Sequence, residues 1–199
     1  YCKLLEAEHG GAAILSQGTS GDLYHADYSK PRAEGEISIL RYSQELATMT
    51  AAAVAGIEHR KEIPVAMTER RLTLKHRTPD EKRLEWARAV VAAMGDRLPK
   101  KLPEVYARQA IHLHENPSTK VVLQALRIGD LGITAIPNEV YAITGLHLKA
   151  RSPLPLTMNI ELANGATGYI PPPEQHHLGG YTTWPAVTAG LAVDAEPEI

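Results

Sequence analysis

Residues 121–184 constrain the fold more than any other part of this chain. Two apolar runs of strand-like composition lie within residues 121–136, and only the turn dipeptide Gly129-Asp130 separates them. A helix-like run follows, and then a third strand-like run over residues 157–163. A hairpin followed by a helix and another strand predicts helices packed on a mixed sheet, in an α/β or mixed α+β fold.

The remaining residues alternate between helix and strand signals. Apolar periodicity, caps and breakers predict helices over residues 1–9, 38–59, 78–94, 103–114 and 140–150. In the third of these helices, Thr78 is the expected cap and Pro79 the expected first residue. Strands are expected at residues 12–15 and 65–75, the latter exposed or at a sheet edge because it carries charges. Residues 169–199 are rich in Pro and Gly and predict an ordered, irregular segment.

The composition limits the classes of protein to consider. The chain has 199 residues, enough for one domain or one and a half, and 44% of them are apolar. A net charge of −2 gives no general attraction to nucleic acid or acidic membranes. The lone Cys2 cannot form an internal disulfide, and no apolar run approaches the roughly 20 residues that span a bilayer. Tyr1 lies inside a helix-like run and Glu196-Pro197 resembles a helix start, so we expect a piece of a longer protein.

Polar side chains stand at the ends of the strand-like runs. They are Glu139, Asn164 and Tyr169. In open α/β sheets, ligands usually bind at such strand ends. Glu139 could hold a metal or act as a general base. It could equally be a carboxylate that stabilises the N-terminus of the following helix, and its position alone favours this second interpretation.

The glycine-rich loop over residues 17–22 is a second candidate site. Its small polar residues could cradle an anion or hold a nucleophile, whereas a tight turn is the simpler interpretation. The loop has neither the spacing of a nucleophile elbow nor the Gly-Lys-Ser/Thr of a phosphate loop. His112 and His114 would not share a helical face, so a metal pair is not expected there. Of the adjacent His176 and His177, one could contact a substrate, and solvent exposure is the alternative.

Three blocks in this order resemble the neutral/alkaline (non-lysosomal) ceramidase family. The first is the Gly-Asp loop within residues 17–22. The second joins residues 126–133 to Ile-Pro-Asn-Glu at residues 136–139, and the third runs from residues 163–172 into residues 174–181. The similarity is greatest to bacterial ceramidase-like proteins of unassigned substrate. Residues 1–199 are thereby identified as the second half of that family's catalytic domain, incomplete at both ends.

This resemblance implies a metal-dependent amidohydrolase. Members of the family are zinc enzymes that cleave the amide of ceramide, a sphingolipid. Their metal is held by two His from the first half of the domain and by a Glu and a Tyr from the second half. The Glu and the Tyr correspond to Glu139 and Tyr169, and the two His would lie upstream of Tyr1. The implied function is hydrolysis of a ceramide-like or other N-acyl amide, with zinc as cofactor and a small or lipid-like substrate.

The resemblance also implies further roles. The expected catalytic residues are Tyr169, Asp22 and Ser20, of which Ser20 lies near the family Ser position but is not in register with it. The expected substrate-binding residues are Gly21, Asn164, Tyr181 and His177. Tyr169 would ligate the metal or donate to the oxyanion, and Asp22 would orient a ligand through a hydrogen bond.

Two departures from the family pattern leave other functions open. The family carries Gly-Asp-x-Ser with that Ser at the metal centre, whereas Tyr24 stands at this position here. Asn138 replaces the usual Gly or Ala before the Glu. A non-catalytic relative with a binding or scaffolding role is therefore the alternative. A weaker third possibility is a module that binds a sugar or an anion through Gly18 to Gly21.

Overall fold

The computed structural model describes residues 1–25, 27, 29–31 and 38–199, and the chain divides into two compact units. Unit 1 contains Tyr1–Ser16 and Tyr24–Ile63. Unit 2 contains Gln17–Leu23 and Pro64–Ile199. The sheet and all of the candidate site residues named above lie in unit 2, so the short loop around residue 20 belongs with the distant C-terminal half.

Unit 1 contains two helices, α1 (Cys2–His9) and α2 (Ile39–Val54). The side chain of Ser38 caps α2 by accepting a hydrogen bond from the amide of Arg41 at 3.2 Å, as expected for a Ser at this position. The strand expected over residues 12–15 is wrong, because these residues have no regular structure and Ile14 is 92% exposed. A strand needs a neighbouring strand for its backbone hydrogen bonds, and a short apolar run does not indicate whether such a neighbour exists.

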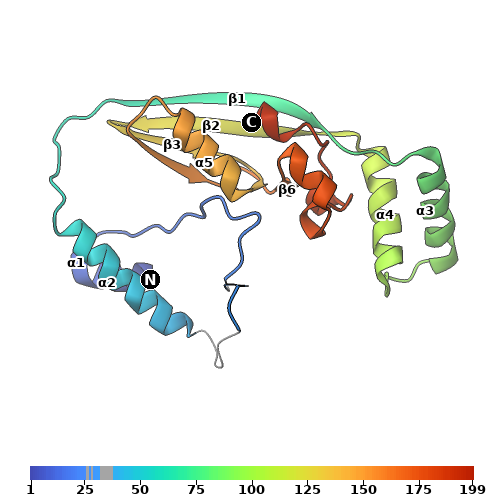
Figure 1. The fold of residues 1–199 in the computed structure, drawn as a ribbon, viewed down its shortest axis with the longest axis horizontal. Coiled ribbons are helices and arrows are strands. Elements are labelled where there is room, and N and C mark those ends of the chain that lie inside the picture. Colours follow the sequence, from blue (N-terminus) through green and yellow to red (C-terminus); the bar gives the residue numbers. More distant parts are fainter. Residues whose placement is uncertain (26, 28, 32–37) are drawn as a thin grey trace. The chain divides into compact units, whose positions relative to one another are not determined.

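Unit 2 is built on a four-stranded mixed sheet in the order β1-β2-β3-β5 (Figure 1). Its strands are β1 (Val65–Lys75), β2 (Ser118–Ile128), β3 (Leu131–Ala135) and β5 (Leu156–Ile160). The first three strands are antiparallel, and β5 adds in parallel to β3. The turn after β2 uses Gly129 at a φ of 60°, a conformation that side chains rarely adopt. The hairpin, the edge position of β1 and the mixed α/β fold class are therefore confirmed.

Two helices inserted between β1 and β2 form a hairpin, α3 (Glu81–Met94) and α4 (Leu102–Glu115) (Figure 1). Small alanines at their contact form a separate core of Ala87, Ala107 and Ala110. Asp80, whose side chain accepts a hydrogen bond from the amide of Arg83 at 2.7 Å, is the N-cap of α3. The expected start with a Thr78 cap and Pro79 as first residue is therefore wrong by two positions, because the side-chain bond forms at Asp80.

A second, two-stranded parallel sheet lies beside the first and consists of β4 (Glu139–Val140) and β6 (Tyr169–Ile170). Helix α5 (Ala142–Arg151) follows β4 directly. The main core joins both sheets and the C-terminal segment, and its buried members are Leu74, Val121, Ile136, Val140, Ile170, Leu191 and Ala195. Because Val140 and Ile170 are buried in this core, the two short strands are anchored although each has only two residues.

The C-terminal segment is irregular but ordered, as expected. It contains four short 3₁₀ helices, η1 (Pro173–Leu178), η2 (Tyr181–Thr183), η3 (Val187–Ala189) and η4 (Glu196–Glu198). The Arg77 guanidinium holds part of this segment by donating to the carbonyls of Leu191 at 3.0 Å, Thr183 at 2.7 Å and Ala189. Partial burial lowers the pKa of Arg77, so the three carbonyls compensate a cation removed from water. In the part of the chain that the structure describes, no helix has the length and apolar character needed to cross a bilayer.

Candidate functional site

Glu139 and Tyr169 are directly paired residues of the parallel strands β4 and β6. The amide of Glu139 donates to the carbonyl of Gly168 at 3.0 Å, which fixes the register of the pair. The hydrogen-bonding influence of the Glu139 carboxylate is the largest cause that raises the pKa of Tyr169 above its ordinary value. Burial and the negative charges nearby raise it further. The structure thus brings together the two residues that were expected to share a site.

Glu139 is not at the N-terminus of a helix. It lies in β4, and α5 begins three positions later at Ala142 with Tyr141 as its N-cap. The macrodipole interpretation of this carboxylate is therefore wrong, because the intervening residues belong to a strand and a cap. The helix expected over residues 140–150 is shifted to start after β4 for the same reason.

Tyr181 lies beside Tyr169 and belongs to η2. Their rings are arranged edge to face with centroids 5.6 Å apart, and a second edge contact at 6.2 Å joins Tyr181 to Trp184. Tyr181 is 59% exposed. An exposed aromatic residue next to Tyr169 offers an apolar contact for any ligand that reaches the Glu139–Tyr169 pair.

The glycine-rich loop packs against the free edge of β4. The amide of Gly21 donates to the carbonyl of Val140 at 2.8 Å. A Cβ at Gly21 would lie 2.7 Å from the carbonyl oxygen of Glu139, so only glycine fits there without a shift of the backbone. Gly21 is therefore part of the packing around Glu139, and its buried position leaves it no surface for a substrate.

The side chains of Asp22 and Ser20 are both engaged with the protein. Asp22 Oδ1 accepts a hydrogen bond from the amide of Ala142 at 2.7 Å, so it caps α5 from a distant part of the sequence. The Ser20 hydroxyl donates to Glu161 Oε1 at 2.5 Å and the Ser20 amide donates to Glu161 Oε2 at 3.2 Å. The amides of Ser20 and Gly21 are already bonded and a carboxylate lies beside them, which argues against an anion cradle in this loop.

Asn164 and His177 do not contact the Glu139–Tyr169 pair through any hydrogen bond of the described residues. The Asn164 side chain is exposed and donates to Gln124 Oε1 on β2 at 3.0 Å. It lies beyond β5, which ends at Ile160 and not at residue 163 as expected. His177 is exposed on η1. Tyr24, which replaces the family Ser, belongs to unit 1 and is 57% exposed.

Sequence reasoning missed the buried Glu161 and did not foresee the burial of Asn138 or of the ring nitrogens of His176. Glu161 is 4% exposed and also accepts a hydrogen bond from the amide of Val140 at 2.8 Å. Asn138 is fully buried, donates to the carbonyl of Gly168 at 3.1 Å, and leaves its Oδ1 without a partner. Both ring nitrogens of His176 are buried without partners, and burial lowers the pKa of this histidine. One signal in the sequence could have indicated the burial of Glu161 and Asn138: each is a polar residue next to apolar residues.

The donor set at the pair fits part of a zinc site. Glu139 supplies a carboxylate and Tyr169 a phenol oxygen, whereas zinc normally takes three or four protein ligands. Within the described residues, no group of three or more His, Cys, Asp or Glu side chains is placed to hold a metal. A complete zinc site would need at least one further ligand besides Glu139 and Tyr169.

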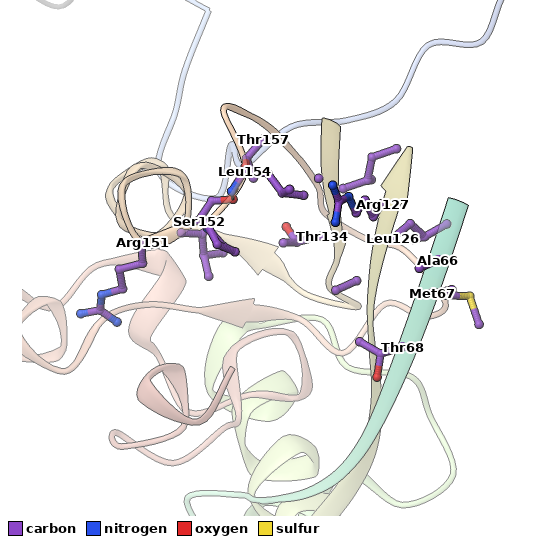
Figure 2. A pocket seen from close by; sticks show the side chains of 15 residues that line it. Ala66, Met67, Thr68, Leu126, Arg127, Thr134, Arg151, Ser152, Leu154 and Thr157 are labelled. Carbon is purple, nitrogen blue, oxygen red and sulfur yellow. Dashed lines mark hydrogen bonds between the residues drawn. The ribbon is translucent and has the colours of Figure 1, made fainter. Parts of the chain in front are cut away.

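A cavity of about 450 Å³ lies elsewhere in unit 2, between one end of the sheet and residues 148–157 (Figure 2). Its size is that of a small-molecule pocket. Two of its polar side chains are already bonded: Arg127 Nε donates to the carbonyl of Gly129 at 2.8 Å, and Thr134 Oγ1 donates to Asn159 Oδ1 at 2.8 Å. Neither Glu139 nor Tyr169 lines it, so the cavity offers apolar volume without reactive groups.

Comparison with known proteins shows a likeness in fold. No model of a known protein family matches the sequence, and no curated protein matches it either. The structure is similar to that of neutral ceramidase from Pseudomonas aeruginosa, with a TM-score of 0.54 and 14% sequence identity. The match covers 96% of this chain and 36% of the ceramidase chain, so this chain spans about a third of that protein. The likeness supports a distant structural relation and a shared mixed α/β fold.

Proposed function

We propose that this chain forms part of a zinc-dependent hydrolase of amide bonds, in which Glu139 and Tyr169 belong to the metal site. The observation that carries the proposal is their direct pairing on β4 and β6, and the Glu139 carboxylate raises the pKa of Tyr169. An acid and a phenol at one point of a sheet suit a hydrolytic centre, because one holds a cation and the other donates to a developing oxyanion. The ceramidase-like fold agrees with a ceramide-like or other N-acyl substrate.

Each residue has a defined part in this proposal. Bound zinc would polarise the amide carbonyl and acidify a water molecule. Glu139 would hold the metal through a carboxylate oxygen. Its interaction with the Tyr169 hydroxyl would orient the phenol. Tyr169 would ligate the metal or donate its proton to the oxyanion. Tyr181, in edge contact with Tyr169, would contact the apolar part of the substrate.

The test is zinc binding and amide hydrolysis by the full-length protein. We expect about one zinc per chain by elemental analysis, with loss of binding in Glu139→Gln and weaker binding in Tyr169→Phe. Matched controls are Glu85→Gln on α3 and Tyr106→Phe on α4. They remove a carboxylate and a phenol hydroxyl at positions outside the Glu139–Tyr169 pair. A wild-type protein without metal, together with an unchanged hydrolytic rate in Glu139→Gln, would refute the proposal.

A specific observation favours a second candidate, a non-catalytic relative that keeps the fold for binding or scaffolding. Ser20 and Asp22, two of the expected catalytic residues, have their side chains bonded within the protein, and Tyr24 replaces the Ser of the family. Zinc-dependent turnover in a screen of N-acyl amides and esters would exclude this candidate.

A further inference from the structure

The buried carboxylate of Glu161 is the centre of a hydrogen-bond cluster beside β4. Oε2 accepts from the amides of Val140 at 2.8 Å and Ser20 at 3.2 Å, and Oε1 accepts from the Ser20 hydroxyl at 2.5 Å. Burying a carboxylate is costly unless its oxygens are bonded, and hydrogen bonds to a charged acceptor are about twice as strong as neutral ones. With three donors on a residue that is 4% exposed, the position of Glu161 fixes the positions of its donors.

Further bonds join the same segments. The amide of Glu161 donates to the carbonyl of Gln17 at 3.0 Å, and Gln17 Nε2 donates to Ser20 Oγ at 2.8 Å. The amide of Gly21 donates to the carbonyl of Val140 at 2.8 Å. The loop is therefore bonded to Glu161 at Gln17 and Ser20, and to β4 at Gly21.

The bond to Val140 acts directly on Glu139. The Val140 amide belongs to the peptide unit that follows the Cα of Glu139, and this unit is planar. A hydrogen bond to that amide therefore restricts the ψ angle of Glu139. Because β4 has only two residues, it has few ladder bonds of its own and depends on contacts at its second edge. That second edge is occupied by Gly21 and Glu161.

We propose that Glu161 is a positioning residue, which holds β4 from the edge opposite β6 and thereby keeps Glu139 beside Tyr169. The inference rests on the proposed function, in which that pair belongs to the metal site. In it Ser20 is a hydrogen-bond partner of Glu161 and not a nucleophile. Glu161 itself touches neither substrate nor metal.

The experiment compares Glu161→Ala with Glu161→Gln in the full chain. Glutamine keeps one oxygen for the two amides, and the Ser20 hydroxyl can reverse its bond to accept from the new amide group. Alanine removes every acceptor and leaves the Val140 and Ser20 amides unpaired. Glu196→Ala is the matched control, because it removes a carboxylate that accepts a hydrogen bond from Thr144 Oγ1 away from β4.

The first measurement is amide hydrogen exchange in the absence of zinc. We expect Glu161→Ala to accelerate exchange about tenfold or more at Val140 and also at Glu139, whose amide bonds to Gly168 across β4 and β6. Glu161→Gln should restore most of the protection at both amides, and Glu196→Ala should leave both unchanged. Faster exchange at Val140 with unchanged exchange at Glu139 would overturn the proposal. Glu161 would then protect the amide that it binds without holding Glu139 in place.

The second measurement is the affinity for zinc ion alone, by calorimetry. Residues that orient metal ligands typically change affinity by about 10–100-fold when they are removed, and we expect a loss in this range for Glu161→Ala with rescue by Glu161→Gln. Equal affinities in wild type and Glu161→Ala would overturn the positioning role. A wild type that binds no zinc would refute the proposed function instead, and the exchange at Glu139 would still decide whether Glu161 holds β4.

Discussion

Tyr169 is paired with Glu139 in a parallel strand pair that has only two residues on each side, and the Glu139 carboxylate raises the pKa of Tyr169. The two side chains are therefore placed by backbone register and do not depend on the reach of a flexible loop.

The interaction between Glu139 and Tyr169 should make stability fall at high pH. The folded pKa of Tyr169 lies above the ordinary value of 10.0, so its stabilising contribution is present below pH 10 and is lost as pH rises toward the folded pKa. In that range the unfolded chain has released the proton and the folded chain has not. Wild type should therefore lose more stability per pH unit than Tyr169→Phe over this range. Denaturant unfolding at pH 8–11.5 measures this difference, and parallel curves would contradict it.

A side chain at Gly21 should disturb β4. The Cβ of Gly21→Ala would lie 2.7 Å from the carbonyl oxygen of Glu139, and overpacking of this kind costs about 1–3 kcal/mol. Gly18→Ala is the matched control in the same loop, because its nearest atom would be 4.0 Å away. Thermal unfolding should separate the two variants, with Gly18→Ala close to wild type. Equal melting temperatures would show that the loop does not pack on β4.

Asp22 should stabilise α5 as a cap supplied from outside the helix. Asp22→Ala removes the acceptor for the Ala142 amide, and loss of an N-cap costs about 1 kcal/mol. Asp22→Asn keeps an acceptor oxygen and should retain most of the stability. Denaturant unfolding of the three proteins at pH 7 measures the effect. Wild-type stability in Asp22→Ala would argue against the cap.

Glu104 should contribute stability that is lost in acid. Arg97 donates to both of its oxygens, at 2.6 Å and 3.0 Å, and the amide of Lys100 donates at 2.7 Å. The hydrogen bond from Arg97 is the largest cause that lowers the pKa of Glu104, to about 2. The contribution is therefore present above pH 4.5 and disappears as pH falls toward 2.

Acid titration of the unfolding free energy between pH 6 and 2 tests this contribution of Glu104. Glu104→Gln should lose less stability over that range than wild type. Glu85→Gln, which removes an exposed carboxylate of α3, should follow the wild-type curve.

Local signals were sufficient to predict most elements of the fold. The Gly129-Asp130 turn located the hairpin, and Gly95 marked the end of α3. In each case the residue that defines the element lies within it or next to it, so a single sequence contains the information. The pairing of Glu139 with Tyr169 was expected only through resemblance to a family, and the structure brings the two residues together as that resemblance implied.

What could not be predicted depends on contacts between distant residues. The strand at Glu139 exists because Gly168 and Gly21 bond to its two edges, and neither is near it in sequence. Glu161 was missed because a lone Glu after an apolar run belongs to no motif, and its donors come from residues 20 and 140. Residues 12–15 were predicted wrongly for the opposite reason, since their apolar pattern has no strand to pair with in the described part of the chain.

The exposed edge of the large sheet has a practical consequence for handling the protein. Strand β1 is 11 residues long and has β2 as its one neighbouring strand in the sheet, and Val65 and Met67 on it are 71% and 60% exposed. Such an edge invites intermolecular strand addition during purification, and the charged side chains of Glu69, Arg70 and Arg71 at its centre oppose it. Replacing those three charges with threonine should turn a dispersed preparation into one that precipitates on concentration.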